Sequence, residues 1–298
     1  MAADLLTPYA RLPRAYRDRT VLHSTVDAFG RAHWLLRTAR GGDDLYDAVV
    51  VTVEDGRSEE THLHSVRARF PRLDALPDGG FVVADARRRT GDGGGDGARD
   101  GEDDEQVQVF DALGRPSWGF PVGDAIEHLL TDPEGRVWVG YFDEGTCGDD
   151  PLSFPGVRCW SSTGAPVWTY EPLPGVGWLV DCYALNVARS AAWAYPYTDF
   201  PLIEVREGRP PLVRSTPVRG ARGFAVHGDR VVFFGGYDES RSRLVDCRLT
   251  DDSIEVVTEG RLLRPDGGEP GRSRVVSRGP RLYVQEEPFT DWAVYDIG

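Results

Sequence analysis

The hydrophobic pattern of this chain consists of short apolar segments that Gly, Pro and Asp interrupt every few residues. Such segments are typical of β-strands bounded by turns, and the interruptions come too often for long amphipathic helices. One arrangement recurs: an apolar strand, a tight turn that usually contains Gly, and a second apolar strand. It is clearest at residues 128–140 and 72–83, with weaker copies at 25–36, 182–195, 222–234 and 273–285.

A strand repeat of about 40–55 residues predicts a β-propeller, in which each copy forms one four-stranded antiparallel blade. We therefore expect a single all-β domain over residues 1–298, with six blades. The last copy has only three predicted strands, and a spare segment precedes the first copy. Because an N-terminal strand added to the last blade would remove an exposed edge, we expect residues 9–12 to close the ring there.

The third copy carries the most specific motif, Asp132-Pro133-Glu134-Gly135-Arg136-Val137-Trp138-Val139-Gly140. It resembles the D-x-x-G-x-(V/I/L)-W-V-(G/A) phrase of NHL-like and regulator-type β-propellers. The resemblance covers nearly the whole chain and is strong only in this copy. It implies a fold and not an activity, since propellers include scaffolds, receptors and enzymes.

Charge and composition exclude several classes of partner and of chemistry. The formal net charge is -14, which repels phosphate backbones and argues against nucleic acid. All 34 basic residues are Arg, so a Schiff-base lysine, a lysine general base and a P-loop lysine are excluded. No membrane-length apolar segment and no secretory signal are visible, so we expect a cytoplasmic monomer without membrane contact.

The four cysteines, Cys147, Cys159, Cys182 and Cys247, are widely spaced and contain no C-x-x-C pair. The last three fall within strand patterns. We therefore expect them to be small buried hydrophobic residues, and not a disulfide or a metal site.

Loop lengths predict which face carries function. In a four-stranded blade, the loop before the inner strand and the loop between the second and third strands open on the same face. In this chain those loops are long, at 87–105, 143–156, 172–178 and 259–271, whereas the opposite turns at 54–56 and 207–208 are short. Long loops on one side of a rigid scaffold commonly carry binding sites. We expect the acidic, Gly-rich segment 91–105 to be a solvated, disordered loop.

The same face combines aromatic side chains with carboxylates near the strand ends. The expected binding residues are Asp143, Glu144, Asp181, Tyr197, Asp199, Tyr237, Asp238, Glu286 and Asp291. Glu127 and His128 approach from an inner strand, with Arg222 and Arg274 as counter-charges. The alternative for each single Asp is that it caps a turn through side-chain to backbone hydrogen bonds.

Two functions remain open. The first is a binding module for a small polar ligand or a protein partner at this acidic, aromatic face. The second is a hydrolase or lyase at the same channel mouth, with a divalent cation such as calcium or magnesium as an optional cofactor. The catalytic candidates are Glu127, His128, Asp143, Tyr197, Asp199 and Arg222, and the metal-ligand candidates are Glu127, Asp143 and Asp199.

No common catalytic signature decides between the two functions. The chain has no G-x-S-x-G, no H-E-x-x-H and no G-x-G-x-x-G after a strand. Asn186 is its only Asn, so it lacks the two Asn ligands that gluconolactonase-type propellers use. An enzyme should have a deep pocket with a carboxylate whose pKa is raised, whereas a scaffold should have solvated acids on a shallower face.

Overall fold

The computed structural model describes residues 2–41, 45–87, 105–237 and 240–298. Almost all regular structure in these ranges is β-strand, apart from one short α-helix, α1 (Asp143–Thr146), and a 3₁₀ turn at Arg14–Tyr16. No helix in this part of the chain is long and apolar enough to cross a lipid bilayer. The acidic segment 91–105 lies outside the described residues, except for Glu105.

The strands form antiparallel sheets in which neighbours in sequence lie side by side. Among the described residues, three sheets have four strands each. The first contains β3 (Val21–Val26), β4 (Ala32–Gly41), β5 (Tyr46–Glu54) and β6 (Arg57–Val66). The second contains β7 (Pro71–Ala75), β8 (Phe81–Asp85), β9 (Val107–Phe110) and β10 (Pro116–Phe120). The third contains β11 (Ile126–Thr131), β12 (Val137–Tyr141), β13 (Val157–Trp160) and β14 (Pro166–Thr169).

Two further sheets include the N-terminal strands β1 (Ala2–Leu5) and β2 (Thr7–Arg11). A five-stranded sheet combines β1 with β19 (Gly223–His227), β20 (Arg230–Phe234), β21 (Arg243–Leu249) and β22 (Ile254–Leu263). An eight-stranded sheet begins with β15 (Asp181–Val187), β16 (Ala192–Tyr197), β17 (Leu202–Val205) and β18 (Leu212–Arg214). It continues with β23 (Ser273–Arg278), β24 (Arg281–Glu286), β25 (Asp291–Asp296) and β2, and the two halves meet at the Asn186–Ser277 pair.

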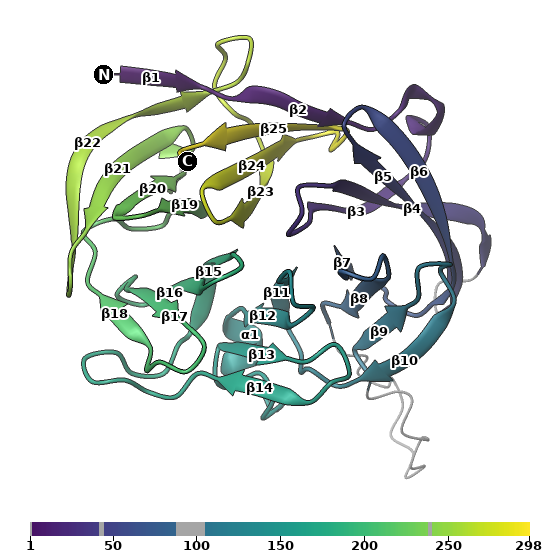
Figure 1. Cartoon of the computed structure of the whole chain (residues 1–298), viewed down its shortest axis with the longest axis horizontal. Helices are drawn as coiled ribbons and strands as arrows, with labels where there is room; N and C mark the ends of the chain where they lie inside the picture. The colour runs from purple at the N-terminus through teal and green to yellow at the C-terminus, as the bar shows by residue number, and fades with distance from the viewer. Residues whose placement is uncertain (1, 42–44, 88–104, 238–239) are drawn as a thin grey trace.

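These sheets are arranged around a central axis, with β3, β7, β11, β15, β19 and β23 innermost (Figure 1). Antiparallel sheets of about four strands that radiate from one axis are the architecture of a β-propeller. The chain is therefore a β-propeller, as its repeat predicts.

The repeated turn has a physical cause in its aspartate. Asp132 Oδ1 accepts the backbone N–H groups of Glu134 (3.1 Å) and Arg136 (2.9 Å), and Oδ2 accepts Arg136 Nε at 2.6 Å. Gly135 has a φ of +84°, a left-handed conformation that favours glycine. The same bonds recur in two other turns, between Asp27 and Arg31 and between Asp111 and Arg115. The phrase recognised in the sequence is thus a turn that stabilises itself.

The N-terminal segment contacts two sheets from the C-terminal part of the chain. Strand β1 pairs in parallel with β22, from Ala2 beside Gly260 to Leu5 beside Leu263, and β2 pairs antiparallel with β25. Leu6, between the two strands, is buried and donates its N–H to Leu263 O at 2.8 Å. One short segment therefore covers the outer edges of both β22 and β25.

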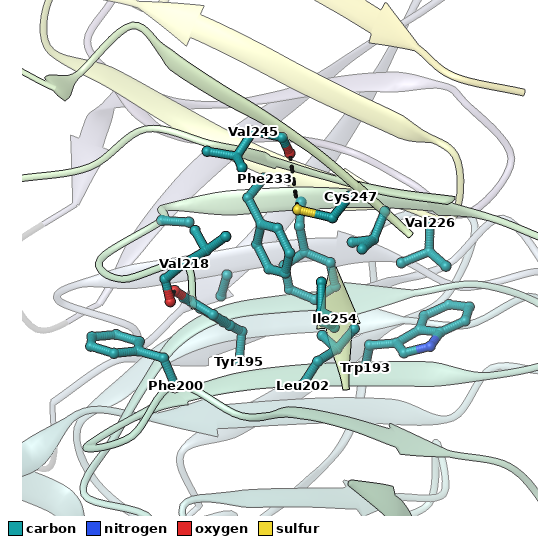
Figure 2. Close-up of a cluster of buried hydrophobic side chains, with 14 of the residues drawn as sticks. Trp193, Tyr195, Phe200, Leu202, Val218, Val226, Phe233, Val245, Cys247 and Ile254 are labelled. Atoms are coloured by element: carbon teal, nitrogen blue, oxygen red, sulfur yellow. Dashed lines mark hydrogen bonds between the residues drawn. The ribbon is translucent and has the colours of Figure 1, made fainter. Parts of the chain in front are cut away.

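The hydrophobic core lies between neighbouring sheets. Figure 2 shows one such cluster, in which Tyr195 on β16 packs beside Phe200 and Phe233 with ring centroids 5.1 and 5.2 Å away. The Tyr195 hydroxyl donates to Val218 O at 2.8 Å, so its polar end is satisfied. Such close packing makes the sheets a rigid support for the loops and strand ends.

The cysteines fit this core as predicted. Cys159, Cys182 and Cys247 are buried as free thiols, and Cys147 is exposed. These three buried cysteines are packing residues, and burial raises the pKa of each of their thiols.

Candidate functional site

A cavity of about 1140 Å³ lies at the centre of the ring. Its walls come from the first residues of the inner strands, among them His23, Arg72, Glu127, Asp181 and Arg274. Because the inner strands begin at the same face of the propeller, their leading side chains converge on one mouth.

The opposite ends of the same strands close the channel. Arg278, the last residue of β23, donates hydrogen bonds to Val26 O (2.9 Å), Thr131 O (2.7 Å) and Asp74 Oδ2. Asp74 is completely buried and also accepts the backbone N–H of Thr131 at 2.6 Å. One guanidinium therefore joins β23 to β3, β7 and β11 across the axis.

Asn186 links the remaining inner strands at this closed end. Its side-chain amide donates to Phe224 O on β19 (2.8 Å) and to Gly279 O after β23 (2.9 Å). Its carbonyl oxygen accepts the Gly279 N–H at 2.6 Å. Asn186 is fully buried and satisfied, so the cavity is open at its mouth and blocked at the far end.

One part of the mouth is acidic. Its carboxylates are Glu127 on β11, Asp143 and Glu144 at the start of α1, and Asp181 at the start of β15. Burial raises the pKa of Asp181, and the negative charges of Glu127 and Asp143 raise it further, to about 6. Asp181 therefore changes protonation near neutral pH and has the properties of a proton donor or acceptor.

Two histidines in the wall are held neutral. Burial lowers the pKa of His128, whose Nε2 lies 3.0 Å from Cys182 O. Burial, together with the positive charges of Arg274 and Arg72, lowers the pKa of His23 well below its ordinary value. His23 Nδ1 accepts the N–H of Leu73 at 3.2 Å, and this contact joins β3 to β7. Both rings are fixed by neighbouring strands.

The other part of the mouth carries arginines. Arg222 Nη2 donates to Ser273 Oγ at 2.8 Å, and Arg274 Nη1 donates to Ser24 Oγ at 3.0 Å. Among the described residues, neither guanidinium has a carboxylate within 4 Å, and Arg222 Nε is buried without a hydrogen-bond partner. Burial and the nearby charge of Arg72 lower the pKa of Arg274 to about 10.

Two more arginines do pair with the acids. Arg72 Nη2 lies 3.6 Å from Glu127 Oε2, and its Nε donates to the Glu127 backbone oxygen at 3.1 Å. Arg87 forms an ion pair with Glu144 at the rim. The charged mouth thus contains both paired and unpaired groups. Those without a described ion pair include Asp181 on β15, Arg222 just before β19 and Arg274 on β23.

An aromatic group lies next to the acidic part. Tyr183 lines the cavity, and its ring centroid is 6.1 Å from Tyr197 and 6.3 Å from Tyr237. The Tyr237 hydroxyl donates to the Tyr183 hydroxyl at 3.3 Å. Tyr197 and Tyr237 are 39% and 50% exposed, so they extend the aromatic surface outward from the mouth.

The remaining predicted residues lie elsewhere. Asp199 is exposed beside this aromatic group and is outside the described lining of the cavity. Glu286 and Asp291 line a second cavity of about 700 Å³ beside β2, where Asp291 pairs with Arg11. Asp238 lies outside the described residues.

No three His, Cys, Asp or Glu side chains in the described ranges are grouped as metal ligands would be. Of the metal-ligand candidates, Glu127 and Asp143 share the central cavity, and Asp199 does not line it. Binding of calcium or magnesium stays a prediction from the sequence.

The wall residues that were not expected from the sequence include His23, Arg72 and Tyr183. Arg72 could have been found from its position within the repeat. Arg72, Glu127 and Arg274 are each the second residue of their inner strand, at Pro71–Ala75, Ile126–Thr131 and Ser273–Arg278. Because these three strands share this register, the second residue of each lines the central cavity.

No family model matches the sequence, and no curated protein is significantly similar to it. Solved structures with a similar fold include virginiamycin B lyase from Staphylococcus aureus, at 12% identity and a TM-score of 0.48, covering 97% of this chain and 99% of that one. Apo AztD from Citrobacter koseri has 12% identity and a TM-score of 0.46, covering 93% and 72%. Raptor from Chaetomium thermophilum has 10% identity and a TM-score of 0.48, covering 90% and 22%.

Proposed function

We propose that this chain is a binding module for a small polar ligand held in the central cavity. The observation that carries the proposal is the form of that cavity, which is closed at one end by Arg278 and Asn186 and lined at its mouth by charged groups. A concave site with a few convergent polar groups is typical of small-molecule binding. A protein partner would need a broad, flatter face, so the small ligand is favoured.

The number of blades and the way the ring closes belong to the same proposal. A six-bladed, NHL-like propeller closed by β2 would hold the walls of the cavity in one fixed ring. The pairing of β2 with β25 supports the closure, since it adds a fourth strand beside β23–β25. A cytoplasmic location, a monomeric state and the absence of nucleic-acid or membrane partners remain predictions from the sequence.

A panel of small carboxylates, phosphates, amines, amino acids and sugars tests the function by thermal unfolding. A ligand that binds only the folded state stabilises it by about 2.7 kcal/mol at a hundredfold excess over its Kd. We expect at least one class to raise the Tm, and Arg274→Met or Asp181→Asn to abolish that rise. The matched control is Arg209→Met, because Arg209 lines a separate cavity. A panel without any rise that depends on the central cavity would contradict the proposal.

A hydrolase or lyase is the second candidate, favoured by the raised pKa of Asp181 in a deep cavity. Here Asp181 would move a proton beside Glu127 and Asp143. The test is mass spectrometry of each compound that binds, after incubation with the protein. Product formation that Asp181→Asn abolishes without loss of binding would establish the enzyme. Unchanged compounds would leave the binding module.

A further inference from the structure

Apart from Arg72 and Arg87, which pair with Glu127 and Glu144, the charges around the cavity are separated by sign. The carboxylates Glu127 and Asp181 belong to β11 and β15, in the lower half of the ring as drawn in Figure 1. Two arginines have no described carboxylate partner. Arg222 directly precedes β19 and Arg274 lies on β23, and both strands are in the upper half of the ring. A single small ligand in this cavity would therefore meet opposite charges at its two ends.

The basic side offers unused donors. A guanidinium carries five N–H groups, and the hydrogen bonds described above use one of them in each of Arg222 and Arg274. The two side chains also stand near like charges, Arg241 in the first case and Arg72 in the second. An anionic group bound beside either guanidinium would offset this repulsion and accept two parallel N–H bonds, the geometry that arginine and carboxylate share.

The acidic side of the cavity includes a carboxylate that lacks a cationic partner among the described residues. Asp181 lies near Glu127 and Asp143, and Asp181 has no basic partner within 4 Å among the described residues. The Tyr183 ring lines the cavity next to this position, with Tyr197 stacked against it. Carboxylates beside an aromatic face form a favourable environment for an ammonium group.

From these two sides we propose that the cavity recognises a zwitterion, with its carboxylate at Arg222 and Arg274 and its ammonium group at Asp181, Glu127 and Tyr183. This inference rests on the proposed ligand-binding function and assigns its ligand class. A volume of about 1140 Å³ is large for a single amino acid, because sites of about 300–1,000 Å³ already hold drug-sized molecules. The ligand class is therefore a short peptide with both termini free.

The charge on each side of the cavity predicts which peptide termini must be free for binding. Loss of one charge-assisted bond weakens binding by about 1.5–3 kcal/mol, which corresponds to about tenfold or more in Kd. Capping either end of the peptide should cost this factor, and capping both ends should abolish measurable binding. Cavity size alone would make no such distinction.

The experiment uses a pooled library of tripeptides in four forms: both termini free, N-acetylated, C-amidated, and both capped. Thermal unfolding and calorimetry of the full chain measure binding of each pool. We expect the free pool to bind and each singly capped pool to bind about tenfold more weakly. In Arg274→Met, C-amidation should weaken binding by a smaller factor than in the unmodified protein, because only Arg222 then distinguishes the free carboxylate. In Asp181→Asn, N-acetylation should likewise weaken binding by a smaller factor, because only Glu127 and Tyr183 then face the ammonium group.

Two results would overturn the zwitterion. One is equal binding of the free and doubly capped pools, and the other is no binding of the free pool. If the panel of small compounds still yields a ligand that Arg274→Met abolishes, the binding function stands and only the ligand class fails. Arg209→Met again serves as the matched control, since it removes one arginine from a separate cavity.

Discussion

The two ends of the central channel are built from the same inner strands and differ in how their charges are satisfied. At the closed end, Arg278 and Asp74 are buried, paired and hydrogen-bonded to neighbouring strands. At the mouth, Arg274 has a hydroxyl and the Phe289 ring as partners but no carboxylate among the described residues, and Asp181 faces other carboxylates. The comparison separates a structural use of charge from a functional one. Satisfied charges hold the ring together, whereas unsatisfied charges are available to a ligand.

The largest effect should come from breaking the closed end. Arg278→Met leaves Asp74 buried without its cation, and we expect the free energy of unfolding to fall by about 4 kcal/mol. Urea unfolding followed by Trp fluorescence measures this. Adding Asp74→Asn should recover part of the loss, because the buried carboxylate is then gone while Thr131 keeps an acceptor. A loss below about 1 kcal/mol would show that the pair does not stabilise the ring.

A smaller loss should follow at Asn186. Replacement by Leu removes both bonds to Gly279 and the bond to Phe224. Phe224 O and the Gly279 N–H lose the partners described here, whereas Gly279 O keeps the Val226 N–H at 2.8 Å. We expect about 3 kcal/mol less stability in the same urea experiment. Stability equal to that of the unmodified protein would mean that water or a rearranged strand replaces these bonds.

Asp181 at the mouth should make the stability of the protein depend on pH. The pKa of Asp181 is about 6 when folded and 3.8 ordinarily, so between these values the folded protein holds a proton that the unfolded chain releases. The free energy of unfolding therefore falls as pH rises from about 4 to 6, and the penalty remains above pH 6. Asp181→Asn should remove this slope, worth about 1 kcal/mol after allowance for solvent screening. Identical pH profiles for both proteins would refute it.

The smallest change in stability is expected for an arginine at the mouth. Arg274→Met makes the same substitution as Arg278→Met but at the mouth. Burial and the charge of Arg72 already disfavour the charged form of Arg274, as its lowered pKa of about 10 indicates. We expect stability to change by at most about 0.5 kcal/mol. A loss as large as that of Arg278→Met would make Arg274 a structural residue.

The local parts of the fold were predictable from the sequence. The hydrophobic alternation and turn residues of the third copy predict strands at 125–131, 136–142, 157–160 and 166–170. The observed limits of β11–β14 each lie within one residue of these. The reason is that alternation and turn residues act over a few positions, as the bonds of Asp132 show. The loop expected at 259–271 was partly wrong, because β22 continues to Leu263 beside β1.

The site was only partly predictable. Glu127, His128, Asp143, Glu144 and Asp181 share the cavity because they lie at or beside the beginnings of inner strands, which the repeat locates. The closed end was not foreseen, since Arg278 and Asp74 are 204 residues apart and meet only across the assembled ring. Local periodicity contains no information about such a contact. It depends on which side chains reach the axis and on what faces them there.

The pairing of β2 with β25 also constrains how the protein is made. Thr7–Arg11 and Asp291–Asp296 are separated by most of the chain, so a ribosome that adds about 5–20 residues per second completes the partner roughly 15–60 s after the first strand. During this time β2 has no β25 to join, and the strand edges of a growing propeller stay exposed. Because an open strand edge can pair with another chain, we expect a chaperone or fast elongation to protect this topology during synthesis.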